Sequence, residues 1–135
     1  MEIRRQFTFG SDDKEFLDAN FPQWESIQES QNQWLLIHDF DIPNGYTLNK
    51  VTVAINIPST YPPAPLDMAY FHPHIIRADG RPIGGTQVVV EIDRKSYQRW
   101  SRHYTTQWDP GCDSLQTHII AIGGWLEKEQ KEGGS

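Results

Sequence analysis

Residues 99–120 place arginine, serine, histidine, cysteine and aspartate side chains between tryptophans. Cys112 is the only cysteine of the chain, and Ser101 lies two residues before His103. In an extended chain, side chains two residues apart project to the same face, so His103 can serve as the general base that a serine hydroxyl needs. The segment predicts a nucleophilic site in which Ser101 or Cys112 attacks a carbonyl carbon.

Neither nucleophile is settled by the sequence alone. Cys112 stands near the start of a predicted helix, where the positive helix end favours a thiolate, but it also fits a half-buried small apolar residue. Beside Ser101, Arg102 or Arg99 can stabilise developing negative charge. Two alternatives stay open: no nucleophile at all, or another hydroxyl such as Thr86, Thr105 or Thr106.

The composition limits the classes of function. The chain has 135 residues and a formal net charge of −6, with its basic residues scattered, which argues against a nucleic-acid partner. No run reaches the roughly 18 apolar residues of a membrane helix, and the start lacks the apolar middle of a signal peptide. We expect a cytoplasmic protein with a single domain over residues 1–130 and a flexible tail over 131–135.

The histidines raise the question of a metal. His72 and His74 lie two residues apart, but no third and fourth ligand is evident. A single cysteine cannot form an internal disulfide, and it excludes a zinc site with several thiolate ligands. We expect no metal and no cofactor.

Hydrophobic periodicity predicts an α+β fold. A short helix begins at Ser11, which we expect to cap it, and ends at Pro22. Alternating or apolar runs predict strands over 24–30, 33–42, 50–58 and 66–71, which is a four-stranded antiparallel meander. A long irregular segment follows, and within it the place of the β-like run 86–92 is left open.

A second helix is predicted from about Asp113 to about Gln130. Leu115, Ile119, Ile122 and Leu126 recur at helical spacing on one face. Gly123-Gly124 costs about 1 kcal/mol per glycine relative to alanine in a helix. We expect close packing of this helix on the sheet to be the reason for the two glycines.

Three short motifs lie between these elements in a recognisable order: YPPAP (61–65), FHPHI (71–75) and WDP (108–110). With the order of helices and strands, they resemble the Tyr-Pro turn, the His-Pro-Asn motif and the Trp-x-Pro motif of the ubiquitin-conjugating enzyme fold superfamily. The sequence most resembles the divergent prokaryotic members, which act in bacterial ubiquitin-like conjugation. The resemblance implies a transferase whose partners are a ubiquitin-like protein, an activating enzyme and a target protein.

The catalytic cysteine of that superfamily is missing from its usual position. Counted from the His-Pro motif, Gly84 stands where the cysteine is expected, and counted back from Trp108 the position falls beside Ser101. The resemblance then implies that His74, in the place of the motif asparagine, stabilises the tetrahedral oxyanion. If Ser101 is buried or lies on the face opposite His74, this hypothesis fails and a non-covalent docking role becomes the better explanation.

The competing hypotheses differ in chemistry. Ser101 would carry the modifier as an oxyester, while Cys112 would carry it as a thioester. Asp109 or Asp113 would orient the acceptor amine or remove its proton, unless Asp113 only caps the last helix. A catalytically inactive docking module and an unrelated small α+β domain are the remaining alternatives.

Overall fold

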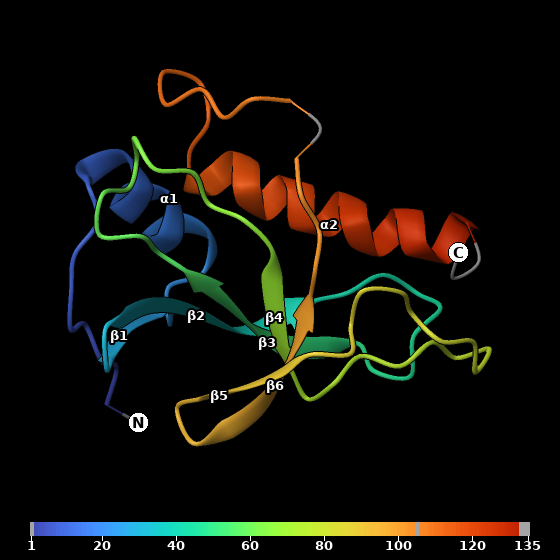
Figure 1. Ribbon diagram of the computed structural model, residues 1–135. Coiled ribbons are helices and arrows are strands. Elements are labelled where there is room, and N and C mark those ends of the chain that lie inside the picture. Colours follow the sequence, from blue (N-terminus) through green and yellow to red (C-terminus); the bar gives the residue numbers. More distant parts are fainter. Residues whose placement is uncertain (1, 105, 133–135) are drawn as a thin grey trace.

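The computed structural model describes residues 2–104 and 106–132. In chain order its elements are α1 (Ser11–Asn20), β1 (Glu25–Glu29), β2 (Asn32–Asp41), β3 (Lys50–Asn56), β4 (Ala69–His72), β5 (Val89–Ile92), β6 (Lys95–Trp100) and α2 (Leu115–Glu132). Figure 1 shows both helices on the same side of the sheet, with α2 running across it. The α+β class with a helix at each end agrees with the prediction.

The strands form one antiparallel sheet in the order β1-β2-β3-β4-β6-β5. The predicted meander corresponds to β1–β4, but the described sheet has six strands instead of four. The run 86–92 supplies β5, which forms a hairpin with β6. Asp93 and Arg94 make its two-residue turn with φ of 53° and 63°, the left-handed pair typical of tight hairpins.

β6 was not predicted, because its sequence KSYQRW carries polar residues on both faces. Tyr97 is nevertheless buried on the face away from the helices, and Gln98 is buried on the other face, where its amide bonds both backbone groups of Ile75. Internal hydrogen bonding thus replaces the apolar alternation by which a strand is recognised. The segment expected to be irregular thus contains two strands, β5 and β6.

The main core lies between the sheet and the helices. The four alternating apolar residues of the 50–58 run are all buried there, as predicted: Val51, Val53, Ile55 and Ile57. They pack in one cluster with the predicted stripe of α2: Leu115, Ile119, Ile122 and Leu126. A second buried cluster, with Trp34, Tyr70 and Tyr97, covers the opposite face of the sheet.

The helix ends differ from the predictions in detail. α1 begins at Ser11 itself, and its N-cap is Gly10, with no side-chain cap hydrogen bond. Added Cβ atoms at Gly123 and Gly124 would meet nothing within 4 Å, so close packing does not explain these glycines. Within the described part of the chain, neither helix has the length and apolar character needed to cross a bilayer.

Candidate functional site

Ser101 lies next to Gly84-Gly85, at the end of β6. It follows the fully buried Trp100 at the end of β6, and its backbone N–H donates a 2.8 Å hydrogen bond to the Gly85 carbonyl. Gly85 has a φ of +72°, and a Cβ added there would lie 3.7 Å from the Ser101 Cβ. The residues that precede and follow the β5–β6 hairpin, Gly84-Gly85 and Ser101, therefore lie side by side.

Ser101, His103 and Asp67 form a hydrogen-bonded series. The His103 Nδ1 lies 2.9 Å from the nearer Asp67 carboxylate oxygen, and its Nε2 lies 3.4 Å from the Ser101 hydroxyl. With the proton on Nδ1 donated to Asp67, Nε2 is left to accept from Ser101. The order hydroxyl, imidazole, carboxylate is the one in which a histidine can act as the base for a serine.

Asp67 was not predicted from the sequence. It lies 36 residues before His103, and the two meet because Ala69 of β4 pairs with Trp100 of β6. The only signal would have been this register, and it required knowing that residues 95–100 form a strand. A carboxylate brought in by strand pairing leaves no spacing pattern in the sequence.

A buried histidine holds both sides of this series in place. His118 is fully buried; its Nδ1 accepts a hydrogen bond from the Tyr104 hydroxyl, and its Nε2 donates a 2.9 Å bond to the Met68 carbonyl. Burial lowers the pKa of His118, which keeps the ring neutral and suited to both bonds. Since Tyr104 follows His103 and Met68 follows Asp67, His118 fixes the distance between the two.

The two candidate arginines are in different situations. Arg102 is committed: it donates to the carbonyls of Gly84 and Ser101 at 3.0 and 3.2 Å and reaches Glu129 of α2 at 3.4 Å. Arg99 lies two residues before Ser101, and its Nε is buried with no hydrogen-bond partner among the described residues. Arg102 therefore ties the loop to α2, and Arg99 is the arginine with a donor to spare.

His74 is not brought together with Ser101. Its Nε2 lies 2.9 Å from the Ser96 hydroxyl, and His72 donates to the Ser96 carbonyl at 2.9 Å. Five residues of extended chain separate Ser96 from Ser101, roughly 16 Å, and an odd spacing sends their side chains to opposite faces. The condition that Ser101 share a face with His74 is not met, so the sequence hypothesis in which His74 stabilises the oxyanion on Ser101 is wrong, and a docking role without covalent chemistry gains support. Any role of Ser101 in catalysis must depend on the other groups described above.

Cys112 is exposed but is in an environment that opposes a thiolate. The carboxylate of Asp109 raises the pKa of the Cys112 thiol, mainly through a hydrogen bond and also through its charge. α2 begins only at Leu115, so Cys112 lies outside the first helical turn, where the effect of the helix end is strongest. Asp113 accepts from the Asp109 backbone N–H at 2.9 Å, and so shapes the turn before α2.

Two of the three remaining candidate hydroxyls lie within the described residues. Thr86 donates to the Ile83 carbonyl at 2.7 Å, and Thr106 is exposed. Thr105 lies outside the described residues. Among the described residues, no group of three or more histidine, cysteine, aspartate or glutamate side chains is placed to hold a metal ion.

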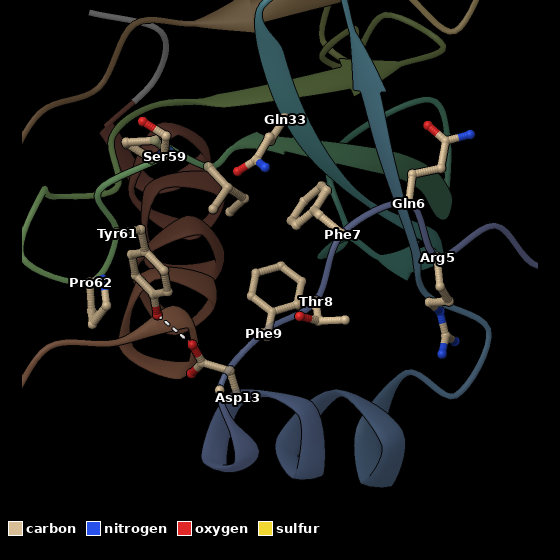
Figure 2. Close-up of a pocket in the computed structure, with 13 residues that line it drawn as sticks. Arg5, Gln6, Phe7, Thr8, Phe9, Asp13, Gln33, Ser59, Tyr61 and Pro62 are labelled. Atoms are coloured by element: carbon tan, nitrogen blue, oxygen red, sulfur yellow. Dashed lines mark hydrogen bonds between the residues drawn. The ribbon is translucent and has the colours of Figure 1, made fainter.

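A separate cleft of about 530 Å³ lies between residues 5–10, the start of α1 and the 57–62 segment. Figure 2 shows Phe7 and Phe9 on one side of it, with Tyr61 and Asp13 joined by a hydrogen bond at its edge. The Tyr61 hydroxyl also accepts the backbone N–H of Leu115, the first residue of α2. Tyr61 thus connects both helix starts through the predicted Tyr-Pro turn, and Ser101 and His103 are not among the residues that line the cleft.

One comparison with known proteins identifies a family. A family model described as prokaryotic E2 family E matches residues 9–129, which includes both helix starts, the whole sheet and the Ser101 loop. No curated protein and no solved structure matches the chain significantly.

Proposed function

The chain belongs to prokaryotic E2 family E, and from this membership we propose that it carries a ubiquitin-like protein as an oxyester on Ser101 and transfers it to an amine. Membership supports ubiquitin-like conjugation in bacteria at a coarse level, with a ubiquitin-like protein and an activating enzyme as partners. The ester linkage and the assignment of Ser101 are our own additions.

One observation carries this assignment. The inserted hairpin returns the chain so that Ser101 lies beside Gly84-Gly85, where the superfamily has its cysteine, and there it contacts His103. A serine hydroxyl is almost never ionised near neutral pH, so it needs such a base where a cysteine would not. The replacement of sulfur by a hydroxyl is accompanied by the additional groups that a hydroxyl requires.

The first step is acyl transfer from the activating enzyme. Ser101 Oγ attacks the thioester carbonyl while its proton passes to His103 Nε2. The carbon–sulfur bond then breaks, and the proton goes to the departing thiolate. Arg99 supplies a positive charge near the tetrahedral oxyanion, in place of the hydrogen bond that the resemblance had assigned to His74.

The second step is aminolysis of the ester. An acceptor amine attacks the carbonyl carbon, gives up a proton to His103, and displaces the Ser101 oxygen, which takes that proton back. Esters react with amines more slowly than thioesters do, so the base is needed in this step as well. His103 is suited to it because 63% of its side chain is exposed and open to an incoming lysine.

The test is formation of the adduct. The protein is mixed with its cognate activating enzyme, ubiquitin-like protein and ATP, and the intact mass is measured. We expect an adduct that survives thiol reductant, is cleaved by mild alkali, is lost in Ser101→Ala and persists in Ser96→Ala. A competent activating enzyme that yields no adduct would overturn the proposal.

A docking module is the second candidate. It is favoured by one observation: the superfamily's oxyanion position, occupied by His74, is not near Ser101. Such a module would bind the ubiquitin-like protein or the activating enzyme without any change in mass. A Cys112 thioester is the third, and it would give an adduct that reductant removes and that Cys112→Ala abolishes.

A further inference from the structure

We propose that this protein also hydrolyses small activated carboxylic esters, with Ser101 as the nucleophile and water as the final acceptor. The activity rests on the proposed function for its nucleophile, but it requires no protein partner. Its substrates are short acyl esters with a good leaving group, such as p-nitrophenyl acetate.

The geometry assigns the protons in this reaction. Because Asp67 accepts a hydrogen bond from the His103 Nδ1–H at 2.9 Å, Nε2 carries the lone pair and lies 3.4 Å from the Ser101 hydroxyl. That contact is at the long end of hydrogen bonding, as is common for such bonds in the absence of substrate. The base is therefore in the correct tautomer before any acyl group arrives.

Water has access to the same base. The His103 side chain is 63% exposed and that of Asp67 is 41% exposed. An acceptor lysine is mostly protonated near neutral pH, since its ordinary pKa is about 10.4, whereas water is always present in excess. Water is a weaker nucleophile than an amine, but an exposed base can accept its proton during the attack, so an acyl group on Ser101 is hydrolysed slowly when no amine is bound.

Arg99 contributes the charge that favours attack. It lies two residues before Ser101, on the same face of an extended chain, and its buried Nε has no hydrogen-bond partner among the described residues. A buried donor without a partner is uncommon and costs stability. What Arg99 offers an acyl group at Ser101 is its positive charge on the same face of the chain, which favours the build-up of negative charge on the carbonyl oxygen.

The reaction is balanced in two steps. Ser101 Oγ attacks the ester carbonyl, its proton passes to His103 Nε2, and the bond to the alkoxide breaks, so that the alcohol leaves with that proton. Water then attacks the acyl-serine, gives its proton to His103, and the bond to Oγ breaks as Ser101 regains a proton. The net reaction consumes one ester and one water and releases one acid and one alcohol.

The test uses p-nitrophenyl acetate with the purified full chain. After subtraction of spontaneous hydrolysis, we expect Ser101→Ala and His103→Ala each to lower the rate at least about tenfold, as loss of a nucleophile or its base does. Ser96→Ala is the matched control, because it removes the hydroxyl of the other serine–histidine contact and is expected to leave the rate unchanged. Circular dichroism of each variant verifies folding.

Acid quenching followed by peptide mass mapping locates the acetyl group, which we expect on Ser101. A rate unchanged in Ser101→Ala, or an acetyl group found on a histidine or lysine instead, would overturn the inference. Absence of esterase activity with a stable Ser101–modifier adduct would refute hydrolysis and leave the proposed function intact. Esterase activity without any adduct would do the reverse.

Discussion

Each end of β6 holds a serine hydroxyl beside a histidine, and the two pairs differ in what supports them. At the start of the strand, Ser96 contacts His74 at 2.9 Å, and no carboxylate among the described residues bonds that histidine. At the other end, Ser101 contacts His103 at 3.4 Å, and Asp67 bonds the far side of the ring. The shorter serine–histidine contact is thus the one whose histidine has no carboxylate partner.

The comparison teaches that distance alone does not identify a nucleophile. A histidine that is not oriented by a second group can adopt either tautomer, and only one of them accepts from the serine. At the Ser101 end, Asp67 fixes the tautomer and His118 holds Asp67 and His103 at their spacing through Met68 and Tyr104. The resemblance had drawn attention to His74, but the supporting groups are at the other end of β6.

The largest expected effect comes from removing the carboxylate that distinguishes the Ser101 end of β6 from the Ser96 end. Asp67→Asn keeps the size of the side chain but removes the charge that holds the His103 tautomer. We expect the rate of Ser101 acylation to fall about 100-fold, within the range of general-base effects. Acylation is followed by single-turnover mass spectrometry, and an unchanged rate would show that Asp67 only packs against the loop.

The second prediction concerns the buried histidine that supports the Ser101 end of β6. His118→Leu leaves the Tyr104 hydroxyl and the Met68 carbonyl without partners, which we expect to cost about 2–4 kcal/mol of unfolding free energy. Urea denaturation measures the loss. Met68 has a φ of 58°, uncommon for a residue other than glycine, so release of its carbonyl should also displace Asp67.

The same histidine is expected to make the stability of the fold depend on pH. Burial lowers the pKa of His118 below its ordinary value of 6.5, so below pH 6.5 the unfolded chain binds a proton that the folded chain does not. Its contribution to stability is therefore complete above pH 6.5 and is lost as the pH falls towards the folded-state pKa. The wild-type Tm should decrease over this window more than the Tm of His118→Leu, and parallel curves would contradict the assignment.

The third prediction moves Ser101 itself. A Cβ at Gly85 would meet the Arg102 guanidinium at 2.9 Å and the Ser101 carbonyl at 3.3 Å, at a φ of +72°. Gly85→Ala is expected to cost about 1–2 kcal/mol through the backbone alone and to slow Ser101 chemistry as well. Gly80→Ala is the matched control, since Gly80 has a φ of +80° with nothing within 4 Å. If both variants slow the chemistry equally, the crowding of Ser101 is irrelevant.

The smallest effect concerns the remaining nucleophile. Because Asp109 raises the pKa of the Cys112 thiol, less thiolate is present near neutral pH and alkylation should be slower than for an ordinary exposed cysteine. Asp109→Asn should therefore accelerate the reaction of Cys112 with iodoacetamide at pH 7.5. A slower reaction in that variant would restore Cys112 as a candidate.

Much of the fold could be predicted from residue patterns, and part of the site could not. The alternation Val51, Val53, Ile55, Ile57 predicted a buried strand because one face of the sheet meets the helices, and the Ser101–His103 contact follows from their spacing of two. β6 escaped prediction because hydrogen bonding of buried Gln98 replaces apolar packing. Asp67 depended on that strand, and His74 was misplaced because motif counting does not anticipate where an inserted hairpin returns.

The most direct measurement is whether thiol reductant cleaves the adduct after one atom at position 101 is changed. Ser101→Cys replaces the hydroxyl oxygen by sulfur at the same position, so the adduct with the ubiquitin-like protein should form and become cleavable by thiol reductant, while the wild-type adduct resists it. Ser96→Cys should leave the adduct resistant. An adduct whose sensitivity to reductant is unchanged in Ser101→Cys would contradict the account, because the acyl group would then be carried by another residue.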